Sequence, residues 1–222
     1  MDQKRSDNAM CFSASASFMA SAYLAFVGAC CLKKNRNKEA TLLAAIPLLF
    51  ALQQACEGIL WLSFDHHWPL LQSIMPYAFL FFALFVWPIW IPLSITVLEP
   101  SQTRRHYLAM FLMVGILIGL YLYHFLIWHG VIAEPTNCHI YYNISIPDVQ
   151  STIDSIAYLL ATVMPFFVSS MPSLWAFGLL LSGSYLITYL FYLHHLISLW
   201  CFFAALLSSF IYLIITKEQQ NV

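Results

Sequence analysis

Residues 41–63 read TLLAAIPLLFALQQACEGILWLS. This run holds a single charged side chain, Glu57, and its other strongly polar groups are the amides of Gln53 and Gln54. A bilayer core about 30 Å thick is crossed by a helix of about 20 mostly apolar residues. The stretch therefore predicts a membrane-spanning helix, and it decides the class of fold.

The rest of the chain has the same character. Its 222 residues are 61% hydrophobic, 17% aromatic and only 9% charged, whereas an average soluble domain has about 25% charged residues. Such a small number of charged residues cannot cover a water-facing surface. Most of the outer surface is therefore expected to contact a lipid bilayer. The net charge is −1 and the nine Lys and Arg residues are scattered, which excludes nucleic acid as a partner.

Outward from residues 41–63, similar runs predict an all-α integral membrane bundle of about seven transmembrane helices, forming one domain over residues 1–222. The third run is long and holds Pro76, Pro88 and Pro92. We interpret it as one kinked span, because neighbouring helices can satisfy backbone groups that a proline leaves free. The predicted spans are 12–32, 41–63, 70–98, 107–128, 153–170, 173–192 and 195–216.

Basic residues predict the orientation, because Lys and Arg in short loops stay on the cytoplasmic side. They fall between the first two spans, at Arg104 and Arg105 between the third and fourth, and at Lys217 after the last. The N-terminus is thus predicted outside and the C-terminus in the cytoplasm. Lys4 and Arg5 oppose this orientation unless the chain starts at Met10, so whether it starts at Met1 or Met10 stays open. Residues 1–11 are interpreted as an N-terminal extension and 129–151 as an outer loop that forms a partly ordered cap.

Two motifs carry a resemblance to a known family. Met-Cys-Phe-Ser-Ala-Ser-Ala-Ser-Phe runs from residue 10 to 18, and Gln-Gln-x-x-Glu-Gly-x-x-Trp runs from residue 53 to 61. Together they resemble an uncharacterised family of small bacterial multi-pass membrane proteins, which implies the bacterial inner membrane but no activity. The seven-helix zinc hydrolases of the alkaline ceramidase type are less similar, because their paired histidines, three residues apart in the last helix, have no match in His194 and His195.

Glu57 is the only carboxylate predicted deep in a span, where such residues usually face the bundle interior and serve a function. Helical spacings of three and four place it on one stripe with Gln53, Gln54 and Trp61. Ser13 lies at the outer end of the first span. We expect these five residues to form an outer-half pocket that binds a small polar solute or ion. The alternative is a structural network in which Glu57 is protonated and hydrogen-bonded.

A second polar set consists of His124, Asp154, His194 and His195, all predicted near the outer face. Imidazole and carboxylate groups can bind a divalent cation such as zinc or can relay protons. No recognised ligand spacing such as His-Glu-x-x-His is present. Ser198 and Cys201 share a helix face with His194, and Tyr158 shares one with Asp154, but no nucleophile-elbow motif accompanies them.

Three further expectations follow from residue types. No span contains a lysine that could hold retinal, so a rhodopsin-like function is excluded. Cys11 and Cys138 are both predicted outside, where an oxidising compartment permits a disulfide. Most of the aromatic residues at span ends are expected to anchor the interface, among them Trp61, Trp68, Trp87, Trp90, Trp128, Tyr141 and Tyr142.

The sequence favours binding or passage of a small polar solute, cation or proton by a multi-pass protein of the cytoplasmic membrane. One alternative is a metal-dependent intramembrane hydrolase acting on lipid, and another is a scaffold without a ligand. Whether the protein is an enzyme, and its oligomeric state, stay open at this point.

Overall fold

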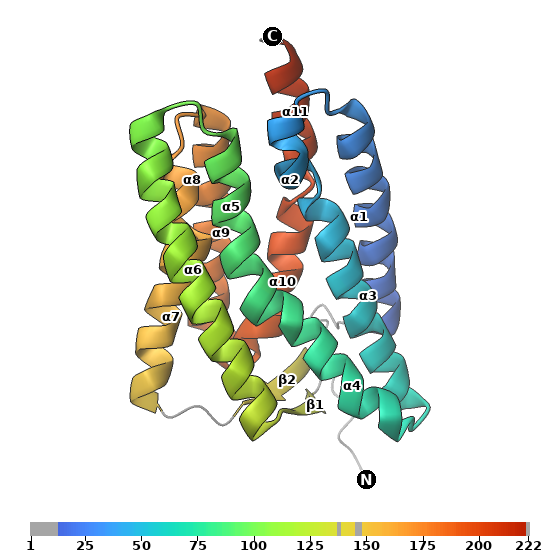
Figure 1. The fold of residues 1–222 in the computed structure, drawn as a ribbon. Helices are drawn as coiled ribbons and strands as arrows, with labels where there is room; N and C mark the ends of the chain where they lie inside the picture. Colours follow the sequence, from blue (N-terminus) through green and yellow to red (C-terminus); the bar gives the residue numbers. More distant parts are fainter. Residues whose placement is uncertain (1–12, 137–138, 145–147, 221–222) are drawn as a thin grey trace.

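A computed structural model describes residues 13–136, 139–144 and 148–220. It is a bundle of helices that run up and down between two ends, with a small β-hairpin covering one of them (Figure 1). We name this the hairpin end. Within the described residues, six helical segments are long and apolar enough to cross a membrane, and Thr152–Val168 is a shorter apolar helix.

The first two spans form an antiparallel pair. Helix α1 (Ala14–Lys34) begins after Ser13, whose Oγ accepts a hydrogen bond from the backbone N–H of Ala16 at 3.4 Å. A short 3₁₀ turn, η1 (Lys38–Ala40), and α2 (Thr41–Ala44) lead into α3 (Ile46–Asp65). The Ser21 hydroxyl on α1 donates to the carbonyl of Ala51 on α3 at 2.8 Å. The pair therefore packs closely enough for a hydrogen bond between the two helices.

The third span is continuous, as the sequence predicts, and its prolines are accommodated without a break. It consists of α4 (Pro69–Leu80), a π-helical segment η2 (Phe81–Val86) and α5 (Trp87–Leu98). Proline lacks an N–H and its ring crowds the preceding turn, and a wider π turn is one way in which helices absorb such a defect. The π segment ends at Val86, two residues before Pro88.

Helix α6 (Gln102–His129) packs against α5 through glycine. A Cβ added at Gly115 would lie 1.7 Å from the carbonyl oxygen of Pro88. Only a residue without a side chain allows this backbone approach, which is the common device of membrane helix pairs. Gly119 lies one turn further along α6. A Cβ added there would lie 3.3 Å from the carbonyl oxygen of Phe85, a tight contact but not a clash as at Gly115.

A β-hairpin occupies part of the predicted outer loop. Strand β1 (Ile132–Thr136) pairs antiparallel with β2 (His139–Asn143), with Glu134 opposite Tyr141. The all-α prediction omitted this hairpin. Its side chains do not alternate clearly between polar and apolar, so the sequence gives little strand signal there.

The C-terminal half completes the bundle. The fifth predicted span is divided into α7 (Asp148–Thr162) and α8 (Met164–Val168), and α9 (Pro172–Phe191) follows. A 3₁₀ turn, η3 (Leu193–His195), leads into α10 (Leu196–Leu207) and α11 (Phe210–Gln220). Helix α7 packs on α5 and α6, whereas α9 packs on α8 and α10. Residues 152–168 would span roughly 25 Å as a helix, slightly less than a typical bilayer core.

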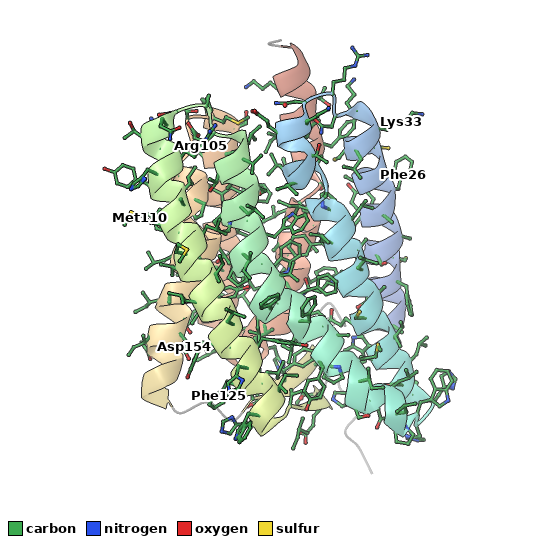
Figure 2. All side chains as sticks on the ribbon, in the orientation of Figure 1. Phe26, Lys33, Arg105, Met110, Phe125 and Asp154 are labelled. Carbon is green, nitrogen blue, oxygen red and sulfur yellow. The ribbon has the colours of Figure 1, made fainter. Side chains whose placement is uncertain are left out.

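The two ends of the bundle differ in their content of basic residues. All Lys and Arg residues of the described ranges lie in or beside the connections at the end opposite the hairpin, which we name the basic end. Figure 2 shows Lys33 and Arg105 at the basic end and Asp154 and Phe125 towards the hairpin end. Helix α1 therefore starts at the hairpin end, and α11 ends at the basic end (Figure 1).

Glu99 holds two connections together at the basic end. Its buried carboxylate accepts hydrogen bonds from the Ser169 hydroxyl at 3.0 Å and from the backbone N–H of Ser170 at 2.8 Å. Its backbone carbonyl accepts two more from the Arg105 guanidinium group, at 3.2 and 2.7 Å. Burial opposes ionisation of Glu99, but the hydrogen bonds from Ser170, Ser169 and Ser101 outweigh it and lower the pKa of this carboxyl group.

Candidate functional site

Glu57 faces the interior of the bundle. It is 1% exposed, and its Oε1 accepts a hydrogen bond of 2.5 Å from the Ser198 hydroxyl on α10. The predicted stripe therefore points at protein, since Gln53, Gln54 and Trp61 are buried as well. Whether any of these residues binds a ligand stays a prediction.

The two glutamines beside Glu57 are fully buried but only partly hydrogen-bonded. Gln53 Oε1 accepts from Trp87 Nε1 at 2.8 Å. Gln53 Nε2 and both amide atoms of Gln54 have no hydrogen-bond partner among the described residues, although the Gln54 side chain lies beside the Glu57 carboxyl group. Buried amides are normally satisfied. By geometry, part of the hydrogen-bonding capacity of these two amides is therefore unused among the described residues.

A cavity of about 340 Å³ lies next to this network, towards the hairpin end. Its wall comes from α7, α9, α10 and β2, with contributions from η2, η3 and α6. Ligand pockets commonly begin at about 300 Å³. The polar groups in the wall include Asp154, His195 and Ser198.

Two residues connect the cavity to the buried network. Ser198 lines the cavity and donates its hydroxyl hydrogen bond to Glu57. Cys201, one turn along the same helix, also lines the cavity, and its thiol lies beside the Gln53 amide. Glu57, Gln53 and Gln54 themselves do not line this cavity. The pocket therefore lies beside the stripe that the sequence predicts as its centre, and Ser198 and Cys201 of α10 adjoin both.

The hairpin contributes a buried phenol to the same region. Tyr142 lines the cavity, is 6% exposed and stacks on Phe79 with ring centroids 5.0 Å apart. Burial raises the pKa of the Tyr142 hydroxyl well above its ordinary value, and the nearby Glu57 carboxyl group raises it further. Tyr142 is thus a neutral hydrogen-bond donor beside the network.

The residues predicted as metal ligands are only partly brought together. Asp154 and His195 both line the cavity, whereas His124 is exposed on α6 with its ring 6.2 Å from that of Trp128. The side chain of His194 lies outside what the structure describes. The described residues contain no group of three or more His, Cys, Asp or Glu side chains placed to hold a metal ion. Zinc binding stays a prediction.

Two other residues that the sequence assigns to the site, Ser13 and Trp61, lie outside the cavity wall. Ser13 caps α1, and Trp61 packs in the apolar core near the hairpin end. Neither lines the cavity. Cys56 and Cys201 are free thiols. The proposed disulfide between Cys11 and Cys138 lies outside the described residues.

Several aromatic residues have a different place from the one expected. Trp68 and Trp128 are exposed, as interfacial anchors would be, but Trp87 is 3% exposed and bonded to Gln53. Tyr185 and Trp200, which no pattern in the sequence distinguishes, line the cavity. Both lie in apolar helices among many other aromatic side chains, so only the tertiary structure selects them.

The helices and the distribution of apolar residues define a multi-pass helical membrane protein with buried polar side chains inside the bundle. A family model matches residues 10–222, and the chain belongs to this family, described as a family of unknown function (DUF6629). No curated protein and no solved structure matches the chain.

Proposed function

We propose that this protein binds a small polar solute or cation in the cavity at the hairpin end, acting as a transporter-like or sensor-like protein of the cytoplasmic membrane. In this proposal the chain crosses the membrane about seven times, with the basic end in the cytoplasm and the hairpin end outside. The Lys and Arg residues gathered at one end support this orientation. Solute would then enter from the outer side.

One observation carries the proposal: a cavity of about 340 Å³ has Ser198 in its wall, and Ser198 is hydrogen-bonded to the buried Glu57. A solute that forms a hydrogen bond with the Ser198 hydroxyl would change the hydrogen bond that this hydroxyl donates to the Glu57 carboxyl group. The Glu57 carboxyl group would respond to a change at the Ser198 hydroxyl, because hydrogen bonds in a low-dielectric interior are strongly coupled. A solute in the cavity would in this way affect the packing contact between α3 and α10.

The proposal is tested by ligand stabilisation of the purified protein in an uncharged detergent. A panel of small cations, anions and neutral polar solutes, with zinc chloride among them, is scanned for an increase in the unfolding temperature, because a ligand that binds only the folded state stabilises it. We expect at least one class of solute to raise the unfolding temperature.

Two tryptophan variants place the effect in the cavity. Ser155→Trp adds bulk at an exposed position of α7 that lines the cavity, whereas Ile156→Trp adds the same side chain on the exposed face of that helix outside the cavity wall. The stabilisation should disappear in Ser155→Trp and persist in Ile156→Trp. A solute effect that survives Ser155→Trp, or a panel without any stabilising solute, would contradict the proposal.

A further inference from the structure

A groove lies on the outside of the bundle between α1 and α11, separate from the cavity at the hairpin end. Its volume is about 480 Å³, and its walls include Phe26 and Cys30 of α1 and Phe210 and Leu213 of α11. Phe26 is 70% exposed and Leu213 is 60% exposed, so the groove opens to the surroundings of the bundle. None of the described residues that line it is charged, and it shares no residue with the cavity. The groove is therefore apolar over most of its surface and accessible to lipid.

The face of α1 that lines the groove continues to two lysines. Tyr23, Phe26 and Cys30 line the groove at spacings of three and four residues, and the same spacings lead on to Lys33 and Lys34. Residues three and four apart share one face of a helix. Both lysines are exposed, and Figure 2 shows Lys33 on the same outer side of α1 as Phe26, nearer the basic end.

The opposite wall has the same arrangement. On α11, Phe210 and Leu213 line the groove, and the exposed Lys217 follows Leu213 by four residues. Seven residues, or about 10 Å of helix, separate Phe26 from Lys33, and the same interval separates Phe210 from Lys217. Because α1 and α11 pack together and both reach the basic end (Figure 1), each wall carries positive charge at that end of the groove.

Few acidic side chains accompany these three lysines. Among the side chains that the structure describes at the basic end, the acids are Glu39 and Glu99. Glu39 lies in η1, which packs on α5, and the Glu99 carboxylate accepts hydrogen bonds from Ser169 and Ser170. The basic end of the groove therefore has an excess of positive charge.

The depth of the groove matches one leaflet of a bilayer. Half of a bilayer core is about 15 Å thick. Tyr23, the lining residue of α1 farthest from the lysines, is ten residues or about 15 Å from Lys33 along the helix. Acyl chains surround an apolar groove at this depth, and lysines at the membrane surface attract anionic headgroups. A second copy of the chain, placed here by a two-fold axis, would instead bring like charges together.

We propose that the groove binds an anionic phospholipid of the leaflet at the basic end, with an acyl chain between α1 and α11 and the headgroup phosphate beside Lys33, Lys34 and Lys217. This inference goes beyond the proposed function, because neither the cavity nor Glu57 takes part in it. It requires that the charge of the headgroup and the acyl chains both contribute to binding.

Three probes separate these contributions: dioleoylphosphatidylglycerol, dioleoylphosphatidylcholine, which has the same chains but no net charge, and glycerophosphoglycerol, which is the anionic headgroup without chains. Native mass spectrometry of the purified full chain in an uncharged detergent measures the affinity for the first lipid bound. Phosphatidylglycerol should bind at least about tenfold more tightly than phosphatidylcholine, since each lysine near an anionic headgroup contributes about fivefold. Glycerophosphoglycerol should not displace it.

Charge variants assign the headgroup site. Lys33→Gln combined with Lys217→Gln removes one charge from each wall and should weaken phosphatidylglycerol binding about 25-fold, while phosphatidylcholine binding stays unchanged. Arg36→Gln combined with Lys38→Gln is the matched control, because it removes the same charge from exposed positions of the connection after α1, outside the groove. It should leave binding nearly unchanged.

Tryptophan variants assign the acyl-chain site. Cys30→Trp fills the groove from α1, whereas Ala25→Trp adds the same side chain at an exposed position of α1 that does not line it. Binding of phosphatidylglycerol should be lost in Cys30→Trp and persist in Ala25→Trp. Thermal unfolding checks that both variants are folded. If Cys30→Trp does not fold, Leu213→Trp fills the groove from the exposed side of α11 and should have the same effect.

Equal affinity for the two lipids would overturn the inference, as would binding that survives either the paired lysine substitutions or the groove-filling tryptophan. A dimer that Cys30→Trp dissociates would assign the groove to a second copy of the chain and would overturn it as well. The proposed function is judged separately, by solute stabilisation that is sensitive to Ser155→Trp, so either proposal can fail while the other stands.

Discussion

The Ser198 hydroxyl on α10 donates a hydrogen bond of 2.5 Å to Oε1 of Glu57 on α3, although the two residues are 141 positions apart in the chain. The bond joins the two halves of the bundle at the place where the cavity wall meets the buried amides of Gln53 and Gln54. Its energetic role can be separated from its part in binding, because one substitution of Glu57 keeps an acceptor at this position and another removes it.

Glu57→Gln should leave the free energy of unfolding nearly unchanged, since the amide oxygen can still accept from Ser198. Glu57→Leu should destabilise the protein by roughly 1–3 kcal/mol, because the Ser198 hydroxyl is left buried without its acceptor. Unfolding in detergent, followed by circular dichroism, measures both. Equal losses in the two variants would show that the charge or the volume of Glu57, rather than this hydrogen bond, is what the fold requires.

Gly115→Ala should destabilise the protein by about 1–3 kcal/mol or more, because the new methyl group would lie 1.7 Å from the Pro88 carbonyl oxygen and force α6 away from α5. Gly183→Ala is the control on α9, where an added Cβ meets nothing within 4 Å. It should stabilise the helix by roughly 0.5–1 kcal/mol. Thermal unfolding of both variants tests the pair, and a neutral Gly115→Ala would contradict the close helix packing.

Glu99 should make the basic end sensitive to acid. Its pKa is lowered in the folded protein, since the hydrogen bonds from Ser169, Ser170 and Ser101 outweigh the effect of burial. The folded state therefore binds a proton less readily than the unfolded chain. The stabilisation is present above the ordinary carboxyl pKa, about 4.3, and is lost as the pH falls through the lower folded value.

The difference in unfolding temperature between the native protein and Glu99→Gln measures this contribution as a function of pH. The native protein should be the more stable at pH 7, and its advantage should shrink as the pH falls below about 4. An advantage that is independent of pH would mean that the carboxylate charge does not contribute.

The proposed orientation is tested with single cysteines at exposed positions of the two ends. A membrane-impermeant thiol reagent applied from outside should label cysteines at Asp65 and His129, at the hairpin end, but not at Arg36 and Gln102, at the basic end. The unsubstituted chain gives the background from its own cysteines. Labelling at Arg36 in intact cells would reverse the orientation and place the cavity on the cytoplasmic side.

The hydropathy of the sequence anticipates much of the fold. Six of the predicted runs appear as helical segments long enough to cross a membrane, the fifth is a shorter apolar segment, and the run with Pro76, Pro88 and Pro92 stays continuous. These features follow from local physics, because a backbone in lipid must satisfy its own hydrogen bonds and does so within a single helix. Spacing along one helix likewise places Glu57 on the same buried stripe as Gln53, Gln54 and Trp61.

The hairpin and the partners of the stripe depend on contacts distant in sequence. The pairing of Glu134 with Tyr141 has no clear period-2 signal, and the burial of Glu99 depends on the connection at Ser169 and Ser170. From the sequence alone, Glu99, a charged residue just after a span, would be predicted to be exposed to water. Only the neighbouring loop, some 70 residues away, provides the donors that allow it to be buried.

The sequence by itself thus determined a membrane bundle with one deep carboxylate, since hydropathy and helical period are properties of single segments. The tertiary structure decided that Ser198 is the partner of Glu57, and that Asp154, Tyr185 and Trp200 meet around a cavity beside the predicted stripe. These residues come from α7, α9 and α10. Which faces of separate helices meet is set by packing between them, and that information is spread over the whole chain rather than held in any one span.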